Sequence, residues 1–146
     1  MTTARELMTE QPTIVKAETS IADIARQLRD DRIGAVIVCN AEDRLQGVVT
    51  DRDIATEVVA AGKDPASTKA MDILTGRETV TIGADDDLDE TVRTMSKHAV
   101  RRLPVIDGER VVGMVSQADV ARYADDKKIA ELVRNVSEAG DNTGQG

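Results

Sequence analysis

Gly47-Val48-Val49-Thr50-Asp51-Arg52-Asp53-Ile54 is the stretch that decides the fold, because it returns 66 residues later as Gly113-Met114-Val115-Ser116-Gln117-Ala118-Asp119-Val120. The lead-ins also agree, since residues 4–9 match residues 70–75 at the same spacing. A period of more than about 60 residues is longer than the unit of a solenoid. The chain is therefore a duplicated small module present in two copies.

Composition limits the classes of protein to which the chain can belong. Its 146 residues carry a net charge of −8, and Tyr123 is the only Phe, Tyr or Trp. An acidic surface repels phosphate backbones, and bases would lack aromatic stacking partners, so we expect no nucleic-acid partner. Cys39 is the only cysteine, and no apolar run is long enough to span a membrane. We expect a soluble cytoplasmic protein without membrane contact.

The first copy is predicted to fold as β-α-β-β-α. Strands are expected at residues 13–15, 33–38 and 45–50. Ser20 is a predicted N-cap, with Asp23 completing a short capping box. The helix that follows has one apolar face at helical spacing, formed by Ile21, Ile24, Ala25 and Leu28. A second helix is expected from about residue 52 to 61, ending at Gly62.

The second copy repeats this order. Strands are expected at residues 79–82, 103–106 and 111–115, and helices begin at Asp87 and at Ala118. We divide the chain into a first repeat, a second repeat and a C-terminal helix with a disordered tail, at residues 1–65, 66–125 and 126–146. The helix of this last part has one apolar side, formed by Ile129, Leu132, Val133 and Val136.

Each copy places a hydroxyl and a carboxylate three residues apart where a strand ends and a helix begins. These pairs are Thr50 with Asp53 and Ser116 with Asp119. Such a junction offers free backbone N–H groups and the positive end of a helix dipole, which suit a phosphate. A carboxylate one turn into the helix accepts hydrogen bonds, as the two hydroxyls of a ribose require. The same spacing is also that of a plain N-terminal cap, so both interpretations stay open.

The duplicated β-α-β-β-α unit, closed by Gly-x-Val-(Thr/Ser)-x-x-Asp, resembles the CBS domain, named after cystathionine β-synthase. The run from His98 to Asp107, HAVRRLPVID, is similar to the signature of a second CBS repeat. The resemblance covers about residues 3–124 and is greatest to small stand-alone CBS-pair proteins of actinobacteria. It implies an α/β (α+β) fold, a tandem pair of units packed sheet to sheet as one Bateman-type module with pseudo-twofold symmetry.

The resemblance also implies two clefts that bind an adenine nucleotide or adenosyl ligand, such as AMP, ADP, ATP, S-adenosylmethionine or NAD. In the family, each cleft takes its ribose acid from one repeat and its other walls from the partner repeat. The first cleft would then contain Thr50, Arg52, Asp53, Val80, Thr81, Arg101, Arg102 and Pro104. The second cleft would contain Thr13, Ile14, Gly34, Ala35, Ile37, Ser116 and Asp119.

The two clefts are not expected to be equivalent. Arg101 and Arg102 align with Gly34 and Ala35, so only the first cleft gains two guanidinium groups, which suit forked phosphate contacts. We therefore predict that the cleft with these arginines is the better phosphate site, although a solvated basic patch would look the same in sequence. Ile37 also stands where the family has proline, which weakens the base-binding wall of the second cleft.

Other reactive residues do not form a catalytic set. His98 is the only histidine, so we expect no structural zinc, and Cys39 is interpreted as packing because no histidine lies in its repeat. The acidic run Asp85-Asp86-Asp87 precedes a helix and is interpreted as cap and dipole charge. We therefore predict no enzyme activity, no metal and no required cofactor.

Two functions remain open. The first is a non-enzymatic ligand sensor that acts through a homodimer and through a protein partner that the sequence does not identify. The second is a ligand-free structural, dimerising or interaction protein, including one tied to a stress response. Only phosphate binding directly explains the asymmetry of the arginines.

Overall fold

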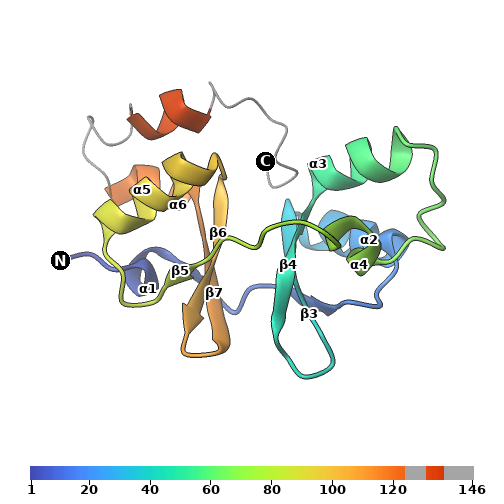
Figure 1. Ribbon diagram of the computed structural model, residues 1–146, viewed down its shortest axis with the longest axis horizontal. Coiled ribbons are helices and arrows are strands. Elements are labelled where there is room, and N and C mark those ends of the chain that lie inside the picture. Colours follow the sequence, from blue (N-terminus) through green and yellow to red (C-terminus); the bar gives the residue numbers. More distant parts are fainter. Residues whose placement is uncertain (124–130, 137–146) are drawn as a thin grey trace. The chain divides into compact units, whose positions relative to one another are not determined.

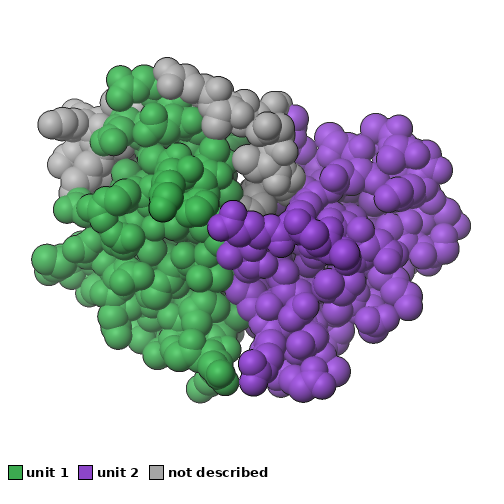
Figure 2. Space-filling view, in the orientation of Figure 1, with its two compact units in different colours: residues 1–12, 80–144, 146 green, residues 13–79, 145 purple. Residues whose placement is uncertain are grey.

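The computed structural model describes residues 1–123 and 131–136, and the chain separates into two compact units (Figure 2). Within the described residues, unit 1 consists of residues 1–12, 80–123 and 131–136, and unit 2 consists of residues 13–79. Each unit has its own sheet and its own apolar core.

Unit 2 has the predicted β-α-β-β-α order, followed by a short helix. Its elements are β2 (Ile14–Lys16), α2 (Ile21–Asp31), β3 (Ala35–Cys39), β4 (Leu45–Thr50), α3 (Asp51–Asp53), η1 (Ile54–Val59) and α4 (Ala70–Leu74). The sheet order is β2-β3-β4, with β2 parallel and β4 antiparallel to β3. Every residue of β3 is buried, as its apolar run predicted.

Unit 1 repeats this order with an extra strand. Its elements are α1 (Ala4–Leu7), β1 (Thr9–Glu10), β5 (Ile82–Gly83), α5 (Leu88–His98), β6 (Arg102–Asp107), β7 (Arg110–Ser116) and α6 (Gln117–Tyr123). The sheet order is β1-β7-β6-β5, in which β5 is parallel to β6 and the other neighbours are antiparallel. Figure 1 shows the β6–β7 hairpin of this sheet. The β6–β7 hairpin has a register shift at Val105, the position that matches the shift at Val38 in the β3–β4 hairpin.

The helix after the first strand begins and ends alike in both copies. The side chains of Ser20 and Asp87 accept hydrogen bonds from backbone N–H groups three residues on, at 3.1 and 2.8 Å, which confirms both predicted caps. Both helices end at a residue in the left-handed conformation, Arg32 in one and Ala99 in the other. The apolar faces of α2 and α5 are buried in their own cores as predicted.

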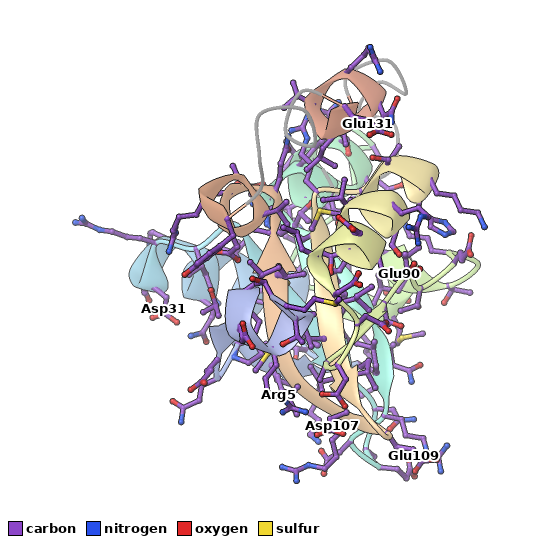
Figure 3. The ribbon with its side chains drawn as sticks, turned by 90° about the vertical axis from the view of Figure 1, so that its left-hand side faces the viewer. Arg5, Asp31, Glu90, Asp107, Glu109 and Glu131 are labelled. Atoms are coloured by element: carbon purple, nitrogen blue, oxygen red, sulfur yellow. The ribbon has the colours of Figure 1, made fainter. Side chains whose placement is uncertain are left out.

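The compact units differ from the sequence repeats at their lead-ins. Residues 1–12 belong to unit 1, where β1 pairs with β7 and the backbone N–H of Ala4 donates to the carbonyl of Asp86 at 2.8 Å. Arg5 lies beside Asp107 with 2.9 Å between Nη2 and Oδ2 (Figure 3). The matching helix α4 packs in unit 2, where the side chain of Leu74 lies against Gly47. Each lead-in therefore completes the core of the repeat other than the one it precedes in sequence.

Two predicted elements differ in detail. The strand expected at residues 79–82 is reduced to β5 (Ile82–Gly83) because Thr79 still belongs to unit 2, where its hydroxyl donates to the carbonyl of Gln46 at 3.0 Å. The helix expected over 52–61 starts as α3 and continues as the π-helix η1, with an i to i+5 bond from Ala60 N–H to the carbonyl of Ala55 at 2.9 Å.

The predicted C-terminal helix lies only partly within the described residues. Residues 131–136 are helical, and Leu132 and Val136 are buried in the core of unit 1. Val133, which was expected on the same side, is 46 % exposed. Ile129 and the predicted tail at 137–146 lie outside the described residues.

We expect Leu7→Ala to destabilise the second repeat more than the first. Leu7 is buried in the core of unit 1, so truncation should lower the free energy of unfolding by about 2 to 4 kcal/mol. Hydrogen exchange followed by mass spectrometry should show lost protection in residues 80–123. Glu6→Ala, at an exposed position of the same helix, is the control. A larger loss in residues 13–79 would contradict the assignment of this lead-in to unit 1.

Candidate functional site: two strand-to-helix junctions

The first junction, residues 50–53, joins β4 to α3 as a complete capping box. The backbone N–H of Thr50 donates to Oδ2 of Asp53 at 2.8 Å, and the backbone N–H of Asp53 donates to Oγ1 of Thr50 at 3.1 Å. Both residues are fully buried. The capping interpretation of this pair is therefore realised in the structure.

The second oxygen of Asp53 is held by an arginine that sequence reasoning missed. Nη1 of Arg77 donates to Oδ1 of Asp53 at 3.1 Å, and Nη2 of the same guanidinium contacts Glu57. Burial raises the pKa of the Asp53 carboxyl above its ordinary value, and the hydrogen bond from Thr50 and the charge of Arg77 pull it back. The first junction thus holds a buried acid with both oxygens engaged.

The second junction, residues 116–119, joins β7 to α6 with the same box in a more open setting. The backbone N–H of Ser116 donates to Oδ2 of Asp119 at 2.9 Å, and the backbone N–H of Asp119 donates to Oγ of Ser116 at 3.1 Å. Asp119 is 15 % exposed. Its Oδ1 lies 3.9 Å from Nη2 of Arg122, which is longer than a hydrogen bond.

The predicted arginines flank the second junction within unit 1. Arg102 lies directly opposite Ser116 in the antiparallel register of β6 and β7. The carbonyl of Arg101 accepts the backbone N–H of Gln117 at 2.8 Å, so both arginines adjoin the start of α6. Both are partly exposed. Two guanidinium groups therefore belong to the same unit as the more open acid.

The first junction has no matching cations from its own hairpin. Ala35 lies opposite Thr50, and the carbonyl of Gly34 accepts the backbone N–H of Asp51 at 3.0 Å. Arg52, the third predicted cation, lies within the junction in α3 and is partly exposed. The alignment asymmetry noted in the sequence is thus also an asymmetry in space.

The remaining predicted site residues lie near strand ends in their own units. In unit 2, Ile14 pairs with Ile37, whose N–H donates to the carbonyl of Thr13 at 2.9 Å. Ile37 is buried, whereas Ile14 is 46 % exposed. In unit 1, Val80 and Pro104 are buried and Thr81 is partly exposed. The grouping of residues from the two repeats into shared clefts stays a prediction.

Arg77 and Glu57 were missed for identifiable reasons. Arg77 lies in the segment after α4, which the sequence marks only as lead-in to the second repeat, 24 residues from Asp53. Glu57 follows Asp53 by one turn, a spacing that brings the two carboxylates to one side of a helix. That pair of acids was the only available signal, and by itself it does not identify the arginine.

The other reactive residues form no site in the described part of the chain. Burial raises the pKa of the Cys39 thiol, which fits a packing role. Among the described residues, no three His, Cys, Asp or Glu side chains are grouped as metal ligands. In the same part of the chain, no helix has both the length and the apolarity needed to cross a membrane.

Unit 1 also has a groove of about 670 Å³ between α5 and the helix at residues 131–136. Glu90 and Glu131 mark these two helices in Figure 3. Its lining is mostly polar and charged, and consists of Asp89, Val92, Arg93, Ser96, Lys97, Glu131 and Asn135. None of the junction residues lines it.

Comparison with known proteins agrees with this architecture. The CBS domain matches the sequence twice, over residues 4–60 and 70–126. The chain belongs to the CBS domain family. It is 36 % identical to Hypoxic response protein 1 of Mycobacterium tuberculosis over 137 residues, which cover 93 % of this chain and 94 % of the relative. The predicted resemblance to CBS-pair proteins is therefore confirmed.

Solved CBS structures share the fold. The crystal structure of Hypoxic Response Protein I with two coordinated zinc ions has a TM-score of 0.76 at 37 % identity, covering 85 % of this chain and all of that one. The CBS domain pair of protein MJ0100, in complex with 5′-methylthioadenosine and S-adenosyl-L-methionine, has a TM-score of 0.73 at 27 % identity. The match covers 84 % of this CBS chain and 94 % of the MJ0100 chain.

We expect Arg77→Met to lower the free energy of unfolding by about 2 kcal/mol at pH 7, because it leaves a buried carboxylate without its cation. Burial raises the pKa of Asp53, so this acid binds its proton more tightly in the folded state than in the unfolded state. Its stabilising contribution is therefore greatest below the unfolded pKa and is lost as the pH rises through the folded pKa. Removing Arg77 raises that folded pKa further.

The loss caused by Arg77→Met should therefore shrink as the pH falls from 7 toward the ordinary Asp value of 3.8. Urea unfolding of the natural sequence and of Arg77→Met at several pH values measures this loss in the free energy of unfolding. The matched control is the same change in an Asp53→Asn background, where the part of the pH dependence due to Asp53 is absent. An equal pH dependence in both backgrounds would show that Asp53 does not depend on Arg77.

Proposed function

We propose that this CBS-pair protein is a non-enzymatic regulatory module that binds an adenine nucleotide or another adenosyl ligand. The second junction is the observation that carries the proposal. There the second oxygen of an acid lies outside hydrogen-bond distance of its nearest described cation, and the acid adjoins a helix start and two arginines of the same unit. This grouping differs from the cleft that the resemblance implied, in which Arg101 and Arg102 join Thr50 and Asp53. These groups suit the diol of a ribose and a phosphate.

At this junction, different groups would bind the ribose and the phosphate of the ligand. Oδ2 of Asp119 is engaged by the backbone of Ser116, which orients the carboxylate. Oδ1 is then the acceptor that a ribose hydroxyl would meet. Arg101 and Arg102 would neutralise the phosphate, and the backbone N–H groups at the start of α6 add a weaker attraction.

The related CBS pair of MJ0100, in complex with 5′-methylthioadenosine and S-adenosyl-L-methionine, supports the adenosyl part of the proposal. Binding would shift the population between free and liganded forms, and a homodimer and a protein partner would transmit the change. A zinc-dependent role is not proposed, because the described residues contain no cluster of metal ligands.

One observation favours the alternative of a ligand-free interaction protein. Both Ser/Thr and Asp pairs form complete capping boxes, so helix capping accounts for the duplicated motif even without a ligand. Helix capping does not account for Arg101 and Arg102, which adjoin the second junction and align with Gly34 and Ala35 at the first. We therefore place ligand binding first.

Thermal unfolding with AMP, ATP, NAD or S-adenosylmethionine should separate the two functions. A ligand present at 100 times its Kd stabilises the folded state by about 2.7 kcal/mol, which raises the Tm by several degrees. Asp119→Asn keeps the size of the side chain and should reduce the shift by about half or more, because a roughly tenfold weaker ligand is then present at about 10 times its Kd. Asp72→Asn, which alters an exposed capping acid of unit 2, is the control. No shift with any of the four compounds would favour the interaction protein.

Arg102→Gln should discriminate ligands by their phosphate. Because the guanidinium would contact phosphate and not ribose, the change should weaken ATP binding about tenfold or more and leave adenosine within about twofold. Isothermal titration calorimetry measures both affinities. Arg110→Gln removes the same charge from the exposed end of β7 and is the control. Equal losses for adenosine and ATP would contradict the phosphate role.

A further inference from the structure

The two junctions differ in what holds their acids. At the first, Oδ2 of Asp53 accepts from the Thr50 backbone and Oδ1 accepts from Arg77, so both oxygens have partners and the side chain is fully buried. At the second, Oδ2 is the only oxygen of Asp119 that has a partner within hydrogen-bond distance among the described residues. The difference is therefore in the second oxygen, the one that a ribose would need.

Arg77 is itself fixed in place. Its backbone N–H donates to the carbonyl of Leu74 at 3.0 Å, and Gly76 before it takes a φ of +86°, which favours glycine. Its guanidinium spans Asp53 and Glu57, and its side chain is only 21 % exposed. A forked arginine between two carboxylates is among the stronger charge-assisted contacts in proteins.

The second copy has no counterpart of Arg77 or of Glu57. At the shift of 66 residues, Arg77 corresponds to Gln11, and Glu57 corresponds to Tyr123. Gln11 is exposed and uncharged. Among the described residues, the nearest cation of Asp119 is Arg122 from its own helix, whose side chain is 69 % exposed. A cation of that kind is screened by water and holds its acid weakly.

We propose that Arg77 makes the two junctions unequal, by occupying the Asp53 carboxylate so that the junction at Ser116 and Asp119 is the one that takes an adenosyl ligand. This inference rests on the proposed function. A neutral diol would have to displace a charged guanidinium from a buried carboxylate. Among the described residues, the same diol meets no such competitor at Asp119.

Stoichiometry of AMP and of S-adenosylmethionine, measured by isothermal titration calorimetry on the full chain, tests the proposal. The natural sequence should bind one ligand per chain, and Asp119→Asn should weaken that binding about tenfold or more. Arg77→Gln should bind two ligands per chain, and Arg77→Gln with Asp119→Asn should bind one. Arg44→Gln removes a charge from an exposed position of unit 2 and should behave like the natural sequence.

Two further variants keep the test decisive if Arg77→Gln does not fold. Glu57→Gln removes one of the described contacts of Arg77 and should add a second, weaker site. Asp53→Asn should leave the single site of the natural sequence within about twofold in affinity, because on this proposal Asp53 takes no part in it.

The possible failures are distinguishable. Two equal sites in the natural sequence, or a single site lost with Asp53→Asn and kept with Asp119→Asn, would overturn the role of Arg77 while retaining the proposed function. No binding of either compound by any variant would overturn the proposed function and this inference together.

Discussion

The backbone N–H groups at the two strand-to-helix junctions are the constraint on which the rest of the structure depends. A helix that begins directly after a buried strand has no upstream turn to accept these bonds, so a side chain must do so. Asp53 and Asp119 fill this role with one oxygen each. The carboxylate is thereby placed at a fixed position and with a fixed orientation at the end of a strand. Its remaining oxygen is what distinguishes a cap from a binding site.

Both repeats contain this capping carboxylate, but the charged residues around it differ. Unit 2 completes its junction with Arg77 from the segment after α4, whereas unit 1 receives its lead-in from residues 1–12, which bring no charge to the matching position. The arginines have the opposite distribution, since Arg101 and Arg102 lie in unit 1 where Gly34 and Ala35 lie in unit 2. The first junction therefore contains a buried ion pair, whereas in unit 1 two arginines flank a junction whose acid is 15 % exposed. On our proposal, this difference in charge gives two copies of the same fold different roles.

The sequence predicted the parts of this structure that depend on local patterns. The caps at Ser20 and Asp87, the buried run of β3 and both hairpins follow from short-range periodicity and turn chemistry. The exchange of lead-ins was not predicted, because the pairing of β1 with β7 joins residues about 100 positions apart and leaves no local trace. The π-helix η1 was missed because its apolar spacing also fits an ordinary α-helix. Arg77 was missed because a partner 24 residues away is identified only by tertiary structure.

Capping and ligand binding need not be competing explanations of the same motif. A carboxylate that is fixed by a backbone N–H has already lost its rotational freedom when the chain folds. A ligand that binds the other oxygen therefore does not have to order this side chain. At Asp119 this second oxygen lies 3.9 Å from an exposed arginine, and at Asp53 it lies 3.1 Å from a largely buried one. On our proposal the cap is a precondition for the site, and the nearest cation decides whether the site is available. A CBS repeat would then lose its ligand when an arginine from its own unit reaches the capping acid, even though the motif itself is intact.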